Sequence, residues 1–256
     1  MDMSSALLTG LMALAFSAVH MFVGKLRFLE VEPRSAWLSF AGGVAVGYVF
    51  MHILPELAAH GEVFADATSL DLKIAESWIY ALALAGLVLF YGLERAIVVS
   101  RDDRKSSRGE TRDRPHSGIF HLHIAASCIL IFVVSYLLNH REDSSVGGLV
   151  LFFGALLLHF LTADFGTRAD HPELYDGQGR WALVTATLGG WIAGLMFDLP
   201  ELAVGCMFAF VGGAIVLVVL KEELPEERAS RFLPFLGGAV LYAALVLGEQ
   251  AMVLPA

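Results

Sequence analysis

The sequence predicts an all-α polytopic membrane protein with eight transmembrane helices. Of its 256 residues, 57% are hydrophobic and only 17% are charged, and the mean hydropathy is +0.67. This composition is far more apolar than that of a soluble domain. A bilayer crossing takes about 20 mostly apolar residues, so we expect one transmembrane domain over residues 1–256. The eight apolar stretches are residues 5–24, 36–58, 76–99, 119–138, 146–165, 181–197, 201–221 and 232–253.

The ends of these stretches carry recognisable signals. The first follows the acidic N-terminus MDMSSALLTG, which has no small-residue cleavage site before a polar region, so we expect this helix to be retained. Pro55 and Pro225 close the second and seventh stretches, where we expect them to end the helices. Glu94 and Arg95 close the third and are expected to anchor it at the membrane interface. A charged cytoplasmic loop, residues 100–118, is expected before the fourth.

Lysine and arginine are distributed unevenly over the expected loops. The odd-numbered loops hold fourteen of them, whereas the even-numbered loops hold only Lys73 and Arg141. Basic residues favour the cytoplasmic side of a membrane. We therefore expect both termini to lie outside. The net charge of −9 says little about partners in such a protein.

One segment of the chain occurs twice. The sixteen residues 42–57, GGVAVGYVFMHILPEL, return as GGAIVLVVLKEELPEE at 212–227, with seven identities in register. Under the expected topology the two copies cross the bilayer in opposite directions, which is typical of transporters with inverted repeats. We expect repeats over about 5–99 and 181–254 on either side of two central helices, residues 119–165. Chance alignment of glycine-rich helices that end in proline is the alternative.

Ionisable side chains at membrane depth are candidate functional groups, because they are costly there. His20, His121, His123, His159 and Asp164 all lie toward the expected cytoplasmic side. Imidazole and carboxylate suit zinc and similar divalent cations, so His123, His159 and Asp164 are the best metal ligands by chemistry. His159 and Asp164 point about 140° apart around a helix. As an alternative, each histidine is a hydrogen-bond partner between helices.

The other polar residues are weaker indicators of function. His52 and Glu56 share one face of the second stretch near its outer end, where we favour an interfacial polar cap over a cation-access site. Residues 170–180 are expected to form a solvated connection. Cys128 and Cys206 stand alone in apolar stretches, which excludes a disulfide framework and a cysteine metal motif. The sequence contains no nucleophile signature, phosphate loop or nucleic-acid motif, so we expect no enzyme.

Together these features resemble the ZIP (zinc and iron permease-like) family of divalent-metal transporters over essentially the whole chain. The likeness rests on the MHILPEL ending of the second stretch, on ALAGLVLFYGLERAI in the third and on GGAIVLVVLKEELPEE in the seventh. Eight helices, outside termini and a charged loop between the third and fourth also agree. The resemblance implies a 3+2+3 helix arrangement with an inverted repeat of helices 1–3 and 6–8.

The resemblance also implies a metal site between the fourth and fifth helices. His123 and His159 match the histidines that open the two family motifs. The following ligand positions depart from the family pattern, and Asp164 stands one position late. The residues that depart are Ile124, Ser127, Phe160 and Ala163. The family's two-metal site cannot be built from these residues.

Three functions remain open. The first is a divergent transporter that moves a divalent cation, zinc above all, through a reduced site of His123, His159 and Asp164, helped by Ser127 or His20. The second is a membrane protein of the same fold that has lost metal transport and acts as a regulatory or structural partner. The third is a transporter of another substrate, such as a proton or a small neutral solute.

We expect no cofactor, with zinc or another divalent metal as substrate. The expected partners are the lipid bilayer and the metal ion, with a homodimer as an open alternative and no nucleic acid. The expected location is a bacterial inner membrane, because a compact chain with strong charge asymmetry fits it.

Overall fold

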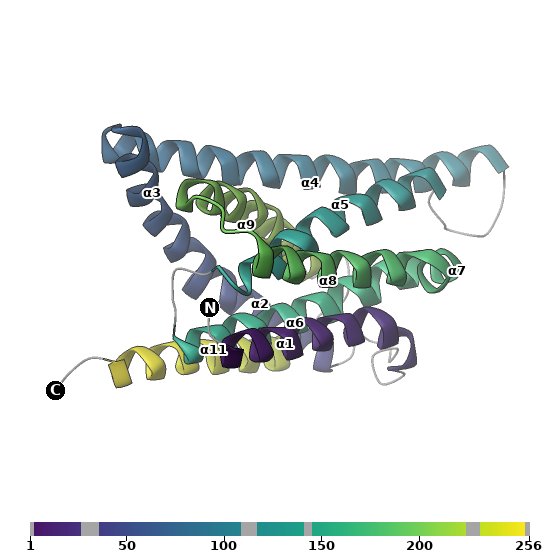
Figure 1. The fold of residues 1–256 in the computed structure, drawn as a ribbon. Helices are drawn as coiled ribbons and strands as arrows, with labels where there is room; N and C mark the ends of the chain where they lie inside the picture. The colour runs from purple at the N-terminus through teal and green to yellow at the C-terminus, as the bar shows by residue number, and fades with distance from the viewer. Residues whose placement is uncertain (1–2, 27–35, 109–116, 141–144, 224–230, 254–256) are drawn as a thin grey trace.

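The chain folds into a bundle of helices in a computed structural model (Figure 1). The structure describes residues 3–26, 36–108, 117–140, 145–223 and 231–253. No β-strand occurs in these ranges. The elements are α1 (Met3–Phe22), η1 (Val23–Lys25), α2 (Ala36–Tyr48), η3 (Val49–Ile53), α3 (Leu54–Thr68), α4 (Leu72–Arg108), α5 (Ser117–Leu137), α6 (Val146–Asp170), α7 (Pro172–Leu174), η4 (Tyr175–Gly179), α8 (Arg180–Met196), α9 (Glu201–Glu223) and α11 (Phe232–Val253).

Among the described residues, seven helical segments are long and apolar enough to cross a membrane. Seven of the eight predicted stretches correspond to them. The stretch predicted at 181–197 is α8, a helix of 17 residues. It packs against α1 and α5. The all-helical architecture is that of a polytopic membrane protein. The seven segments are Met3–Lys25, Ala36–Thr68, Leu72–Ala96, Gly118–Leu137, Val146–Asp170, Glu201–Lys221 and Phe232–Ala251.

The second segment does not end at its proline. It continues for 33 residues through the π-helical turn η3 and on through α3 to Thr68. Pro55 has no N–H to donate, and its ring would clash with the carbonyl four residues back, that of Met51. The wider turn at Val49–Ile53 contains that carbonyl, so the helix accommodates the proline instead of stopping. The prediction that Pro55 ends its helix was therefore wrong, whereas Pro225 lies outside the described residues.

The third segment also runs further than predicted. α4 extends over 37 residues to Arg108, so the loop expected at 100–118 is helical in its first part. Arginine, lysine and aspartate tolerate a helix, and extending an existing helix needs no new nucleus. The next helix, α5, begins at Ser117, and residues 109–116 lie outside the described part.

The helices form two layers. Figure 1 shows α1, α6 and α11 along one side of the bundle and α4, α5 and α9 along the other. The closest helix pairs are α2 with α11, α4 with α9, and α5 with α8, while α1 packs on both α6 and α8. The α2–α3 segment is the most buried of the seven. Its Tyr48, Ile53 and Leu57 lie in the core with Phe16 of α1 and Leu156 of α6.

The backbones of α2 and α11 touch where they cross. A Cβ atom placed on Gly43 would lie 2.0 Å from the carbonyl oxygen of Phe235, and one placed on Gly238 would lie 2.1 Å from that of Phe40. No other residue type fits at either position without moving a helix. Small residues allow this close approach between membrane helices.

A second crossing, between α4 and α9, is built in the same way. A Cβ atom on Gly213 would lie 1.7 Å from the carbonyl oxygen of Ala83, and one on Gly86 would lie 1.9 Å from that of Phe210. Each crossing thus has two glycines, one from each helix, and each glycine faces a carbonyl of the other helix.

The two crossings have the same register. The α2 positions 43 and 40 lie 170 residues before the α9 positions 213 and 210, and the α4 positions 86 and 83 lie 152 residues before the α11 positions 238 and 235. The offset of 170 is also that between the repeated segments 42–57 and 212–227. The offset that aligns the two repeated sequences therefore also aligns the residues at which their helices touch.

Adjacent glycines on α11 provide a test of these contacts. Gly238 faces the carbonyl of Phe40, whereas a Cβ atom on Gly237 would meet nothing within 4 Å. We expect Gly238→Ala to lower the free energy of unfolding by about 1–3 kcal/mol through overpacking. Gly237→Ala should leave stability unchanged or raise it by up to about 1 kcal/mol, because alanine favours a helix. Thermal unfolding of both variants in detergent measures the difference, and equal effects would contradict the close crossing.

Candidate functional site

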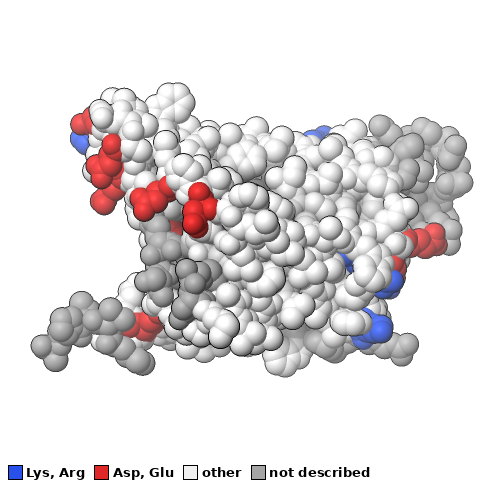
Figure 2. All heavy atoms as spheres, viewed as in Figure 1, with Lys and Arg blue, Asp and Glu red and all other residues white. Residues whose placement is uncertain are grey.

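The basic side chains of the described residues lie mostly toward one end of the bundle (Figure 2). Figure 2 shows acidic side chains gathered where α3 meets α4, and most of the visible basic side chains toward the opposite end. We call the end that holds Lys25, Arg168 and Arg180 the basic end, and the end that holds Glu62 and Asp66 the acidic end. The basic end is the one that the charge count predicts to be cytoplasmic. Most of the candidate ligands lie near it.

A buried pair joins α1 to α6 near the basic end. His20 Nδ1 lies 2.6 Å from Asp164 Oδ2, and the two side chains are 0% and 7% exposed. The hydroxyl of Tyr175, in η4, donates a hydrogen bond to the His20 carbonyl at 3.1 Å. Burial raises the pKa of the Tyr175 phenol far above its usual range, with the Asp164 carboxylate adding to the effect, so the phenol stays protonated. The side-chain pair thus joins α1 to α6, and the Tyr175 hydroxyl joins η4 to the backbone of α1.

Aromatic rings surround this pair on the α1 side of α6. Phe160, one turn before Asp164, has its ring centroid 5.0 Å from that of Phe16 and 5.3 Å from that of His20. Phe160 and Asp164 share a face of α6 because they are four residues apart. His159 is five residues before Asp164, which is about 140° around an ideal helix, so it belongs to another face of α6. Its side chain is buried, at 4% exposure. The sequence does not predict that Asp164 pairs with His20.

His123 of α5 lies in a second polar group. Its Nε2 is 3.4 Å from Thr167 Oγ1 of α6, and its Nδ1 is 4.0 Å from Glu94 Oε1 of α4. Glu94 in turn forms an ion pair with Lys221 of α9. Thr167 follows Asp164 by three residues, so this group lies about one turn along α6 from the first.

One further predicted ligand has a local partner. The Ser127 hydroxyl donates to the carbonyl of His123 within α5 at 2.9 Å, which uses its proton inside the helix. At His159 the backbone carbonyl accepts from the Thr162 hydroxyl at 2.8 Å, a bond that does not involve the imidazole. Among the described residues, no three His, Cys, Asp or Glu side chains lie close enough together to hold a metal ion. The structure thus brings His20 to Asp164 and His123 to Glu94.

Sequence reasoning missed Glu94, Thr167 and Lys221. Glu94 was expected to anchor α4 at the membrane interface, yet its side chain is only 16% exposed and faces Lys221. A signal was present in the sequence. Glu94 follows Gly86 by eight residues, and Lys221 follows Gly213 by eight residues. Two helices that cross at those glycines and run in the same direction bring the two charges together.

The segment expected to be a solvated connection, residues 170–180, instead packs on the bundle. Tyr175 is 1% exposed. Arg168 binds Asp176 with two hydrogen bonds, from Nε at 2.9 Å and from Nη2 at 2.8 Å. This bond holds the pKa of Asp176 below its usual range. Gly24 makes room for the guanidinium, because a Cβ atom there would lie 2.4 Å from Arg168 Nε.

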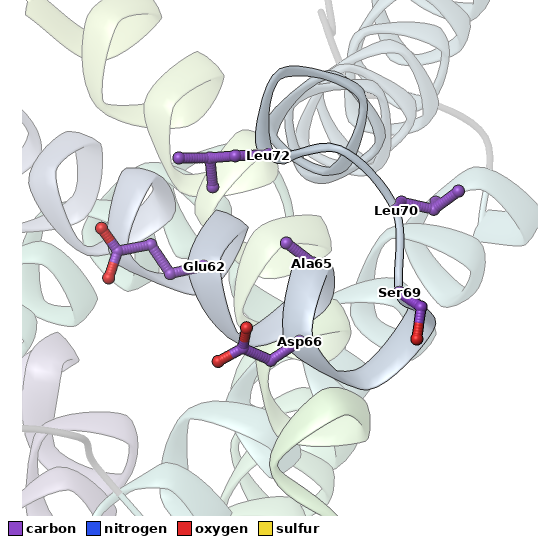
Figure 3. Close-up of a pocket in the computed structure, with 6 residues that line it drawn as sticks. All are labelled: Glu62, Ala65, Asp66, Ser69, Leu70 and Leu72. Carbon is purple, nitrogen blue, oxygen red and sulfur yellow. The ribbon is translucent and has the colours of Figure 1, made fainter.

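Two other polar features lie on the α2–α3 segment. His52 Nε2 lies 3.7 Å from Glu56 Oε2, and these side chains are 16% and 14% exposed; the interfacial cap expected for them stays a prediction. An open hollow lies at the turn from α3 to α4. Figure 3 shows the carboxylates of Glu62 and Asp66 on the same side of α3. The hollow is lined by Glu62, Ala65, Asp66, Ser69, Leu70 and Leu72.

No protein-family model matches the chain. The chain is similar to a zinc transporter. It is 27% identical over 224 residues to Zinc transporter ZIP13 of Pongo abelii, a match that covers 82% of this chain and 56% of that protein. The chain therefore spans about half the length of the curated relative it matches.

The buried pair predicts a specific loss of stability. We expect His20→Ala to lower the free energy of unfolding by about 3 kcal/mol, because it leaves the buried Asp164 carboxyl without its imidazole partner. His121→Ala is the control, since His121 is an exposed histidine of α5 at the same end of the bundle. The double variant His20→Ala/Asp164→Ala should lose less than the sum of its single variants. Thermal unfolding in detergent measures all four, and a His20→Ala variant as stable as His121→Ala would contradict the pairing.

Proposed function

We propose that this protein is a divergent ZIP-family transporter that moves a divalent cation, zinc above all, across a membrane. The observation that carries the proposal is the row of imidazole and carboxylate groups along α6 and its neighbours, in a chain similar to a zinc transporter over 82% of its length. Ionisable groups at membrane depth typically mark an ion pathway. The donors also have the chemistry that zinc prefers.

The proposal includes eight crossings in a 3+2+3 arrangement. The first repeat is α1, the α2–α3 segment and α4, the central helices are α5 and α6, and the second repeat is α8, α9 and α11. Two observations support an inverted repeat: the shared offset of 170 and the matching glycine crossings. In this arrangement the basic end is cytoplasmic and both termini lie outside. A bacterial inner membrane and a homodimer remain predictions.

The proposed metal site is a reduced one between α5 and α6. His123 and His159 supply imidazole and Asp164 supplies carboxylate, with Ser127 and His20 as helpers. These groups do not converge on one point in the described conformation. Alternating access accounts for this, because a transporter must dismantle its site in order to release the ion. The glycine crossings support α2 with α11 and α4 with α9 as rigid pairs past which α5 and α6 move.

A second candidate function is a regulatory or structural role in a protein that has lost metal transport, or transport of another substrate. The observation that favours it is the absence of a three-ligand group among the described residues. Apolar residues at the ligand positions also favour it. Phe160 packs on Phe16 and His20, and Ile124 lies buried near Gly179.

Metal flux distinguishes the two functions. We expect saturable uptake of zinc and cadmium into proteoliposomes that contain the purified protein. At subsaturating zinc, His159→Ala should lower the initial rate by about tenfold or more, since losing an imidazole weakens a site that already has few ligands. His121→Ala should transport at the wild-type rate. Wild-type flux no greater than that of empty vesicles would favour the second candidate function.

A further inference from the structure

We propose that Glu94 and His123 form a second divalent-cation site on the exit side of the pathway, and that the Lys221 ammonium occupies it when no metal is bound. This inference rests on the proposed function and adds to it a built-in competitor for the metal. The site lies at the basic end, one turn beyond Asp164 along α6. It uses a carboxylate on α4 that the predicted metal site does not include.

The carboxylate of Glu94 faces two partners at once. Its Oε2 is paired with Lys221 Nζ, and its Oε1 lies 4.0 Å from His123 Nδ1. On the far side of the imidazole, Nε2 lies 3.4 Å from the Thr167 hydroxyl. The Glu94 and His123 side chains are 16% and 19% exposed. Three helices thus direct one carboxylate, one imidazole and one ammonium to the same place, while the Thr167 hydroxyl of α6 lies on the other side of the imidazole.

The ion pair is not needed to hold its helices together. At the α2–α11 crossing, the positions that correspond to Lys221 and Glu94 by the same offsets are Met51 and Val246, both apolar. Val246 lies in the hydrophobic core, and the partly buried side chain of Met51 packs against that core. Eight residues after the crossing glycines, α2 and α11 therefore have apolar side chains, whereas α4 and α9 have side chains of opposite charge. Since charges cost free energy at membrane depth, their presence on α4 and α9 indicates a role beyond packing.

An ammonium can vacate this place without movement of the backbone. The Lys221 side chain is 29% exposed and has a flexible four-carbon stem, whereas Glu94 is more buried. A divalent ion that leaves Asp164 would meet a carboxylate and an imidazole about one turn nearer to the basic end. Two protein ligands, completed by water, hold zinc more weakly than the three or four of a structural site. Return of the ammonium then favours release.

Direct zinc binding tests the inference without requiring transport. We expect Lys221→Met to bind zinc roughly fivefold to tenfold more tightly than the wild type in equilibrium dialysis, because the competing cation is gone. Adding Glu94→Gln to Lys221→Met should abolish that gain. Lys25→Met is the matched control, since it removes an exposed positive charge at the same end and should leave affinity unchanged.

The outcomes separate the inference from the proposed function. If the wild-type protein transports zinc but Lys221→Met binds zinc with unchanged affinity, the inference is overturned and the proposed function is not. A Glu94-dependent gain in affinity without wild-type flux overturns the transport function and supports the cation site.

Folding is checked in the same series. Glu94→Val/Lys221→Met reproduces the residues of the related crossing, so we expect it to unfold near the wild-type temperature. If Lys221→Met alone does not fold, added zinc should restore the folded protein, because the bound metal then neutralises the negative charge of the Glu94 carboxylate. Failure of zinc to do so would overturn the inference.

Discussion

The close contact of helix backbones at two glycine crossings is the constraint on which the rest of this structure depends. Helices in a bilayer gain little from burying apolar side chains, because lipid is equally apolar, so they associate largely through close packing. Gly43 and Gly238 remove the side chains that would separate α2 from α11, and Gly86 and Gly213 do the same for α4 and α9. Each pair becomes a unit with a defined register. That register decides which polar groups meet further along.

Polar contacts fix the remaining helices at both ends of the bundle. At the basic end, α1 is tied to α6 through His20 and Asp164. At its other end, the Thr9 hydroxyl lies 2.8 Å from Asn139 Oδ1 and accepts a hydrogen bond from Trp191 Nε1 at 3.1 Å, which ties α1 to the end of α5 and to α8. Such contacts are specific in an apolar setting, because few other partners are available. The candidate ligands thus lie on helices whose positions are set by a few named contacts.

Much of the candidate site could be predicted from the sequence, but its pairing could not. Histidines and an aspartate at membrane depth are visible in any hydropathy pattern, and the divergence of His159 and Asp164 follows from helical geometry. The partner of Asp164 depends on how α1 packs on α6, which no periodicity within either helix specifies. Glu94 was placed at the interface because it ends an apolar stretch. Its true neighbour, Lys221, is 127 residues away in sequence.

The sequence by itself determined the all-helical membrane architecture, because apolar length and composition act locally and need no partner. It also determined the register of the repeated segment, since both copies carry their glycines at the same positions. Only the tertiary structure decided that η3 lets the α2–α3 segment continue past Pro55, that α4 runs on to Arg108 and that the candidate ligands form two groups. These outcomes depend on which helices touch and at what level, and that is a property of the assembled bundle rather than of any one segment.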